Sequence, residues 1–250
     1  MDSIHISLQA ETLGHLFGLP ITNSLILSLL TAFFLVGGGF LVAKRLQWVP
    51  GKAQSTVELI IGGLLDFMTQ VVGDRKQAFK FFPLVATIFL FILFNNWIGV
   101  LPGTGSIGMF EEEHGQSVFV PFFRSAAADL NTTFALAIIA VLAVQLYAIQ
   151  KLGFFGHIGK YFNFTHGPIH LFVGLLELVG EFARVVSFSF RLFGNIFAGE
   201  VLLIIIMTLV PVLIPLPFIF LEFFVGFIQA LVFAMLTLVF LKVATTQVEH

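Results

Sequence analysis

Residues 187–200 read SFSFRLFGNIFAGE, an apolar run that contains Arg191 and ends in Glu200. The residues that follow, 201–221, carry no charge at all. A guanidinium group stays protonated in any environment that a protein offers, so Arg191 remains a cation wherever the chain places it. If the run crosses a bilayer, that charge costs about 2.5 kcal/mol or more, and we expect it to have a function.

The composition predicts an all-α integral membrane protein with one polytopic domain over residues 1–250. The chain has 58% hydrophobic and 10% charged residues, against about 25% charged residues in a soluble domain, so too few charges are present to cover a soluble surface. It has no cysteine, which excludes disulfides and thiolate metal sites. No cofactor, metal or nucleic-acid partner is expected. Residues 1–20 contain no Lys or Arg, so we expect no signal peptide.

Five segments are long and apolar enough to cross a bilayer, which requires about 20 residues in a helix. A sixth segment, residues 52–73, differs because its polar side chains fall on one narrow face at about 100° per residue. This amphipathic pattern predicts a helix that lies along the membrane surface. Residues 1–20 and 101–128 are predicted to lie outside the membrane. The predicted spans are residues 21–43, 81–100, 129–150, 167–210 and 218–244.

The last two spans are unusually long. More than 40 helical residues at about 1.5 Å each would extend some 60 Å, twice the hydrocarbon thickness, so the helix over 167–210 is expected to tilt steeply. Pro211, Pro215 and Pro217 predict the turn to the last helix, since prolines interrupt a helix interior. The two spans are therefore expected to form a steeply tilted hairpin.

The short loops predict the orientation, because Lys and Arg concentrate on the cytoplasmic side. Glu11 and Glu111–Glu113 fall on the opposite side, where Arg124 is the only nearby cation. We therefore expect the N-terminus outside and the C-terminus in the cytoplasm. The basic residues on the inner side are Lys44, Arg45, Lys52, Arg75, Lys76, Lys80, Lys151, Lys160 and Lys242.

Polar residues form one stripe along the helix over 167–210. On a helical wheel, Arg191 and Asn195 fall within about 40° of Glu177, whereas Glu200 lies about 180° from Arg191. On the last helix, Glu222 and Gln229 are seven residues apart and share a face. Two polar surfaces therefore approach Arg191 from opposite sides of the membrane. The stripe comprises His166, His170, Glu177, Glu181, Arg184, Arg191 and Asn195.

Structural explanations compete with a functional one for several of these residues. Glu181 and Arg184 are placed to pair with each other near the interface, and Asn195 and Gln229 could be interhelical hydrogen-bonding groups. Asp129 or Asn131 could be the N-cap of the third span. Arg191 has no acidic residue at i±3 or i±4, so its counter-charge must come from another helix or subunit. Glu200 and Glu222 have no cation nearby in sequence, which suggests proton carriers.

The run from Arg191 to Glu200 resembles the signature of the a subunit of rotary F-type ATP synthases, in their bacterial form. Three further motifs match the family and occur along the chain in the same order as in the family. The resemblance therefore covers nearly the whole chain from Pro50 onward. They are residues 96–102 (NWIGVLP), Asp129-Leu130-Asn131 with Thr133, and Glu222 with Gln229-Ala230.

The resemblance implies a proton-translocating stator subunit in a bacterial plasma membrane. Its partners would be the ring of c subunits, the peripheral-stalk b subunits and the rest of the F1Fo complex. Arg191 would face the ring carboxylates between two offset half-channels, and so couple proton flow to rotation. No ATP chemistry is expected in this chain. Glu200 and Glu222 would line the outer half-channel and Glu177 the inner exit, with Asn195, Gln229, Asp129 and Asn131 also on the path.

A stand-alone ion channel or secondary transporter is the main alternative. A voltage sensor would repeat arginine along one helix, and many transporters show repeated halves; neither pattern is present here. A purely structural subunit would leave Arg191 unexplained. At the position of Glu222 the family often has histidine, so the properties of that relay do not transfer. The sequence leaves open whether the ion is H⁺ or Na⁺.

Overall fold

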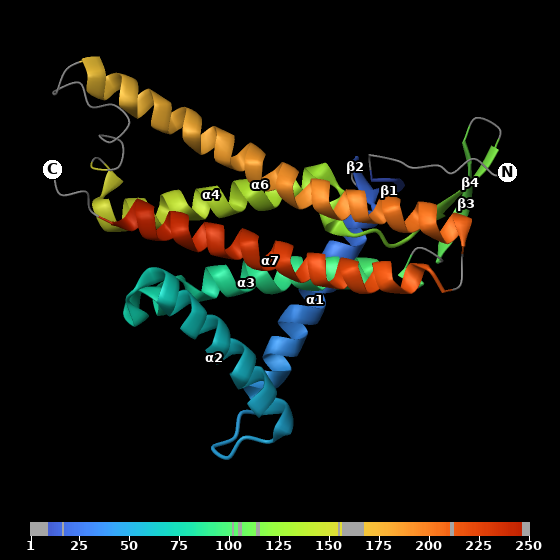
Figure 1. Cartoon of the computed structure of the whole chain (residues 1–250), viewed down its shortest axis with the longest axis horizontal. Coiled ribbons are helices and arrows are strands. Elements are labelled where there is room, and N and C mark those ends of the chain that lie inside the picture. The colour runs from blue at the N-terminus through green and yellow to red at the C-terminus, as the bar shows by residue number, and fades with distance from the viewer. Residues whose placement is uncertain are drawn as a thin grey trace.

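The computed structural model describes residues 10–16, 18–101, 103–104, 107–113, 116–154, 156, 168–210 and 213–246. Long helices dominate these ranges, and two β-hairpins lie together at one end of the molecule (Figure 1). The helices are α1 (Asn23–Lys44), α2 (Lys52–Val72), α3 (Arg75–Val100), α4 (Leu130–Leu152), α6 (Pro168–Leu209) and α7 (Pro215–Thr245), with a 3-10 turn, η2 (Ala126–Ala128). The strands are β1 (Thr12–Leu16), β2 (Leu19–Thr22), β3 (Gly108–Glu113) and β4 (Gln116–Pro121).

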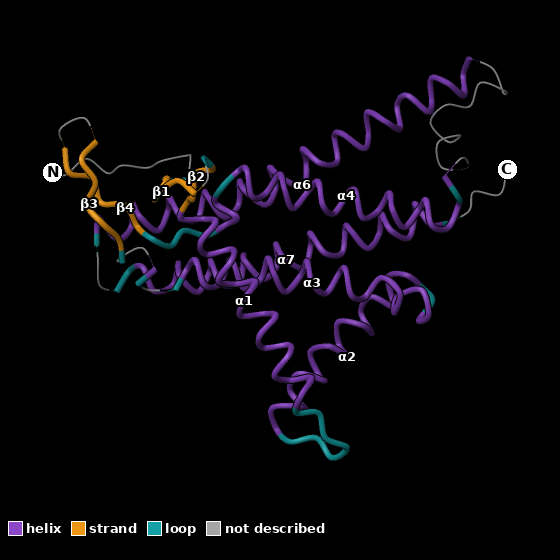
Figure 2. Tube along the Cα trace, turned by 180° about the vertical axis from the view of Figure 1, so that it is seen from behind, coloured by secondary structure: helices purple, strands orange, loops and turns teal. Residues whose placement is uncertain are grey.

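The helices α3, α4 and α7 run side by side along the long axis, and α7 packs against both of the others (Figures 1 and 2). Helix α6 crosses them obliquely. It packs on α4 and α7 near the hairpins and diverges from them toward its own N-terminus. Helices α1 and α2 leave the bundle and form a V. We call the end with the strands the hairpin end, and the other the opposite end.

The predicted all-α membrane fold is confirmed. Among the described residues, six helices are long and apolar enough to cross a membrane. The two antiparallel β-hairpins, β1–β2 and β3–β4, are additions that the sequence analysis did not predict within residues 1–20 and 101–128. Both hairpins lie outside the long helices, so they do not alter the helical character of the membrane part.

Helix α2 is one of the six by length and composition alone. Its C-terminal half packs on α3 and α7 through Met68 and Val72, which are buried. Its N-terminal half leaves Leu59 and Ile60 exposed at 76% and 53%. That α2 lies along the membrane surface remains a prediction, based on its polar stripe.

Helix α3 starts earlier than predicted. The sequence predicted a span over residues 81–100, but the helix begins at Arg75 and contains Pro83 in its interior. Gly73 ends α2 in a left-handed conformation, with φ of 84°, that favours glycine. The Asp74 side chain then accepts hydrogen bonds from the N–H groups of Lys76 and Gln77. This capping lets the charged residues extend α3 as a helix.

The α6–α7 hairpin also differs at its turn. Helix α7 begins at Pro215 and not at residue 218, because a proline in the first helical turn has no N–H that needs a partner. The 42 residues of α6 and the 31 of α7 correspond to about 63 and 47 Å, both longer than the hydrocarbon core. The two helices meet at the hairpin end and separate toward the opposite end (Figure 1).

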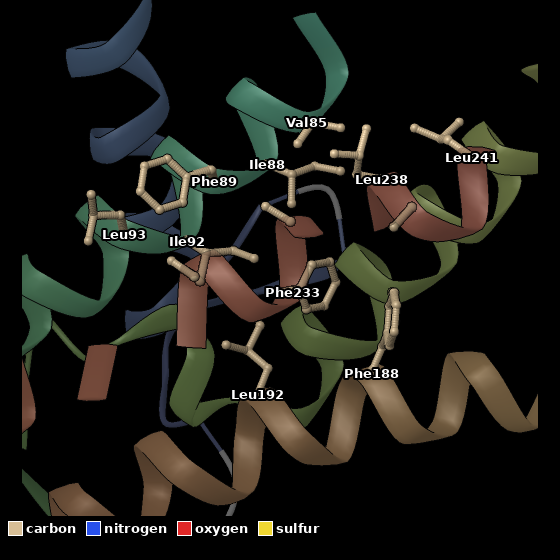
Figure 3. Packing of buried hydrophobic residues seen from close by; sticks show 14 of the residues in the cluster. Val85, Ile88, Phe89, Ile92, Leu93, Phe188, Leu192, Phe233, Leu238 and Leu241 are labelled. Atoms are coloured by element: carbon tan, nitrogen blue, oxygen red, sulfur yellow. The ribbon is translucent and has the colours of Figure 1, made fainter. Parts of the chain in front are cut away.

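The apolar core lies where α6 crosses α4 and α7, with α3 on the other side of α7 (Figure 3). Phe188 of α6 packs on Phe233 of α7 with ring centroids 4.8 Å apart, and Leu192 beside it is fully buried. Side chains of α3, including Ile88 and Ile92, cover the other side of α7. In a bilayer such packing stabilises through close contact more than through water exclusion. It fixes the rotation of α6, and therefore the direction of Arg191, the residue before Leu192.

Candidate functional site

Arg191 lies on the exposed face of α6. Its neighbour Leu192 and the buried Phe188, one turn earlier, point into the core, so Arg191 is turned away from it. Within the part of the chain that the structure describes, Arg191 has neither an ion pair nor a hydrogen bond through its side chain. That its counter-charge belongs to another helix or subunit remains a prediction.

Asn195 and Gln229 bridge α6 and α7 one turn from Arg191. The Asn195 Nδ2 donates to Gln229 Oε1 at 2.7 Å. Gln229 is buried, and its Nε2 has no hydrogen-bond partner among the described residues. A buried amide N–H without a partner is costly, so a water oxygen that accepts from it would be favoured beside it. The pair both connects the helices and offers a polar position.

Glu222 of α7 is buried at 5% exposure, and its Oε2 has no hydrogen-bond partner in the described residues. Its carboxyl group occupies the space beside Gly199 of α6 that any larger side chain would need. Glycine at position 199 is thus required for α7 to bring a carboxyl group this close to α6. An incompletely bonded carboxylate inside a membrane helix hairpin is a group suited to taking up a proton.

Glu200, the next residue on α6, pairs with Arg124. The Arg124 Nε lies 3.2 Å from Glu200 Oε1 and 3.3 Å from Oε2. The guanidinium also lies over the ring of Phe197, 5.9 Å from its centroid. No cation is near Glu200 along the chain, so this partner, 76 residues away, was not predicted from the sequence. The sequence did contain an indication of this pairing, because Arg124 is the only cation near the acidic loop at Glu111–Glu113.

Toward the opposite end, Arg184 pairs with Glu181 at 2.6 Å, and its guanidinium stacks 3.8 Å from the centroid of Phe240. In the structure, Glu181 and Arg184 therefore neutralise each other, as in the structural alternative given above. Glu177, one turn further toward the opposite end, is partly exposed. The acidic and basic groups on this half of α6 thus lie on the far side of Arg191 from Glu200.

Asp129 caps α4, as one of the predicted alternatives proposed. Its carboxylate accepts from the N–H of Asn131 at 3.1 Å, from Thr132 Oγ1 at 2.9 Å and from Ser24 Oγ of α1 at 3.0 Å. Asp129 and Asn131 both line an open pocket of about 440 Å³ between α1, α3 and α4 at the hairpin end. Asn131 is exposed whereas Asp129 is buried, and no described contact joins them to Glu200 or Glu222.

The structure therefore brings the predicted residues together in three groups. Asn195 with Gln229 and Glu222 with Gly199 join α6 to α7; Glu200 meets Arg124; Asp129 and Asn131 form the rim of a separate pocket. Groups of three or more His, Cys, Asp or Glu able to hold a metal are absent from the described residues. Polar groups on both sides of a cation that has no charged partner within the described ranges, on helices long enough to cross a membrane, are typical of an ion-translocating membrane protein.

Comparisons with known proteins identify the family to which this ion-translocating protein belongs. The family profile described as ATP synthase A chain matches residues 24–242, and the chain belongs to this family. It is 34% identical to the sodium-ion-specific ATP synthase subunit a of Propionigenium modestum, over 96% of this chain and 80% of that protein. It is 36% identical to ATP synthase subunit a of Syntrophobacter fumaroxidans, over 86% and 80% of the two chains. Subunit a of Campylobacter jejuni is also 36% identical, over 88% of each.

The chain is thus a multi-pass membrane subunit of the ATP synthase complex. Its role is that of the proton-translocating stator of the Fo sector, since the family and the helical fold agree on it. No feature of the described residues favours a stand-alone channel or transporter. The family does not by itself assign the individual side chains, and their roles are proposed below.

Proposed function

We propose that Arg191 is the fixed cation that faces the carboxylates of a ring of c subunits and couples proton flow to rotation. The observation that carries this proposal is its position. Arg191 is exposed on α6, without a charged partner in the described residues, while both neighbouring arginines along the path are paired. A carboxylate on a neighbouring subunit would supply the counter-charge that a membrane-embedded guanidinium requires.

The surface beside Arg191 supports a neighbour of this kind. Toward the N-terminus of α6, the large apolar side chains of Val173 and Leu176 fall within about 60° of Arg191 around the helix, and they are 56% and 54% exposed. Small residues of the same helix, Gly194 and Ala198, are exposed on the other side of Arg191. Helix α6 diverges from α4 and α7 where the apolar residues lie, which leaves this face open (Figure 1). A smooth apolar surface with one charge suits a ring that slides past it.

The polar groups would form two offset half-channels that end at Arg191. Glu200, Glu222, Gln229 and Asn195 would lead a proton from the hairpin end to the ring. Glu177 would mark the exit at the opposite end. Arginine suits the divider between the two routes because it does not give up its proton, whereas a desolvated lysine can. Each proton that crosses 100 mV releases about 2.3 kcal/mol, and several must sum to one ATP.

Asp129 and Asn131 would belong to the outer access region. This assignment is supported by the pocket at the hairpin end, which both residues line. Asp129 also has a structural role as the N-cap of α4. The pocket opens between α1 and α4, so protons would have to pass η2 to reach Glu200. These two residues would therefore act at a distance from the central relay, and their contribution to the rate should be smaller.

The remaining assignments concern the surroundings of the chain. The hairpin end would face the outside of a bacterial plasma membrane, and the opposite end the cytoplasm, because Lys76, Lys80 and Lys242 lie on helix ends there. The c-subunit ring and the peripheral-stalk b subunits would be the direct partners. The proton would be the coupling ion, although the name of one relative specifies sodium.

Replacing Arg191 by alanine tests the proposal. In the purified complex in liposomes, Arg191→Ala should abolish proton-driven ATP synthesis while subunit a stays assembled, because only the ring-facing charge is lost. The exposed and paired Arg75 provides a matched control, since Arg75→Ala removes an equal side chain from the start of α3. Coupled synthesis by Arg191→Ala would contradict the proposal. Synthesis driven by a sodium gradient when a protonophore removes the proton gradient would contradict the choice of ion.

A further inference from the structure

Arg124 is a second arginine beside the proposed path, and the roles proposed above do not use it. It lies in the segment between β4 and η2, at the hairpin end, and reaches α6 across the end of the bundle. Its Nε is within 3.3 Å of both oxygens of Glu200. Glu200 is the outermost carboxylate of the relay on α6, so Arg124 lies where a proton arriving from the hairpin end first meets that helix.

The exposure of this pair distinguishes it from an ordinary surface ion pair. The Arg124 side chain is 7% exposed and that of Glu200 30%, against 70% and 60% for Arg75 and Asp66. Exposed pairs contribute little, whereas a buried charge that loses its partner is strongly destabilised. The position of Arg124 is therefore coupled to the charge on Glu200.

The backbone around Arg124 is held from several sides. Ser125 packs so closely on α3 that a Cβ at Gly99 would lie 2.6 Å from its own Cβ. The three alanines of η2 that follow are at most 3% exposed, and η2 packs against α1, α3, α4 and α6. Arg124 is thus anchored by its neighbours independently of Glu200. A guanidinium on a fixed support can orient a carboxyl group, which a freely moving side chain cannot.

Proton transfer through Glu200 changes what Arg124 faces. When a proton adds to a carboxylate oxygen, the ion pair becomes a hydrogen bond from the cationic guanidinium to a neutral carboxyl group; when the proton moves on, the ion pair forms again. Three other acidic groups lie in this region. Glu11 is close enough to act on the charge of Glu200, Glu222 lies against Gly199, and Asp129 is engaged with Ser24. Arg124 is the cation that the described contacts place on Glu200.

We propose that Arg124 is a positioning residue for proton uptake: it holds the Glu200 carboxyl group at the outer side of α6 and supplies its counter-charge after each proton departs. This inference rests on the proposed role of Glu200 in the path. It adds a residue outside the α6–α7 hairpin to that path. The two arginines then have different roles. Arg191 faces the ring, and Arg124 positions the carboxyl group from which protons pass to the ring.

The test uses the whole complex in liposomes, with the rate of ATP synthesis measured against the proton concentration on the uptake side. Arg124→Gln should lower the rate about tenfold and move the half-maximal proton concentration, because Glu200 loses its partner. Arg124→Lys keeps the charge and should recover part of the rate. Arg75→Gln serves as the control and should alter neither quantity. A full rate with unchanged proton dependence in Arg124→Gln would overturn the proposal.

A double variant separates positioning from a general structural role. If Arg124 acts through Glu200, then Arg124→Gln with Glu200→Gln should be no slower than Glu200→Gln alone, within about twofold. Effects that multiply would contradict the proposal. If Arg124→Gln does not assemble, the double variant should restore assembly, since no charge is then buried alone; failure there would also overturn it. An unchanged rate in Glu200→Gln would instead refute the proposed path itself.

Discussion

Arg191 and Arg124 are two arginines of one membrane protein with opposite surroundings. Arg191 is exposed on a helix face and has no charged partner among the described residues. Arg124 is buried beside Glu200 and supported by a segment that packs on four other elements. The pairing of Arg184 with Glu181 falls between them, since both side chains are about one-fifth exposed.

The difference shows where each charge finds its counter-charge. Burying a guanidinium inside the subunit requires a partner from the same chain, and Arg124 has one. A guanidinium at an interface can instead pair with an anionic group of another subunit, and the exposed position of Arg191 allows this. The comparison therefore predicts that the two positions respond differently to the same substitution.

The largest difference is expected for lysine substitutions. Arg191→Lys should lower ATP synthesis by more than about a hundredfold and increase passive proton leak, because a desolvated ammonium can release its proton. Arg124→Lys should lower synthesis only about threefold, since its task is to face one carboxylate. Synthesis and leak rates in liposomes measure both. Equal losses at the two positions would remove the distinction between a dividing and a positioning arginine.

The glycine beside the relay should give the next largest effect. A Cβ at position 199 would meet the carboxyl group of Glu222, which is the flexible end of a side chain and can move aside. Gly199→Ala should therefore assemble normally but lower synthesis about tenfold by displacing Glu222. Gly63→Ala on α2, where no atom lies within 4 Å of the added Cβ, is the matched control. Wild-type rates in Gly199→Ala would argue against Glu222 as a relay.

A smaller effect is expected at Asp129. Asparagine keeps an oxygen for the N–H of Asn131 and an amide group for the Ser24 and Thr132 hydroxyls, so Asp129→Asn should preserve the cap while it removes the charge. Synthesis should fall about threefold if the pocket is an access region. Asp129→Ala, which removes the cap as well, should also lower the thermal stability of the complex. An unchanged rate in Asp129→Asn would leave Asp129 with the structural role alone.

The exposed pair of Arg75 and Asp66 should show the smallest effect. Its side chains are 70% and 60% exposed, so water and salt screen the interaction. Neither Arg75→Gln nor Asp66→Asn should measurably change synthesis, assembly or thermal stability. A clear loss of synthesis in either variant would mean that the junction between α2 and α3 contributes to coupling, and would make burial a poor guide to function among the arginines.

The sequence by itself determined the class of the protein and most of its helices, because length and hydrophobicity set what can cross a bilayer. It also singled out Arg191, since an intramembrane cation without a nearby acidic residue needs an external reason. Helix boundaries were less accurate at charges and prolines. Asp74 capping extended α3 back to Arg75, and the first-turn tolerance for proline allowed α7 to begin at Pro215.

Only the tertiary structure decided which polar residues meet. Sequence spacing places side chains on one helix face, but it does not show which loop reaches that face from elsewhere in the chain. The pairing of Glu200 with Arg124, 76 residues away, depends on the packing of η2 against α6. The approach of Glu222 to Gly199 likewise depends on the crossing of α6 and α7 around Phe188 and Phe233. Such contacts follow from side-chain packing between helices, which hydrophobic periodicity does not specify.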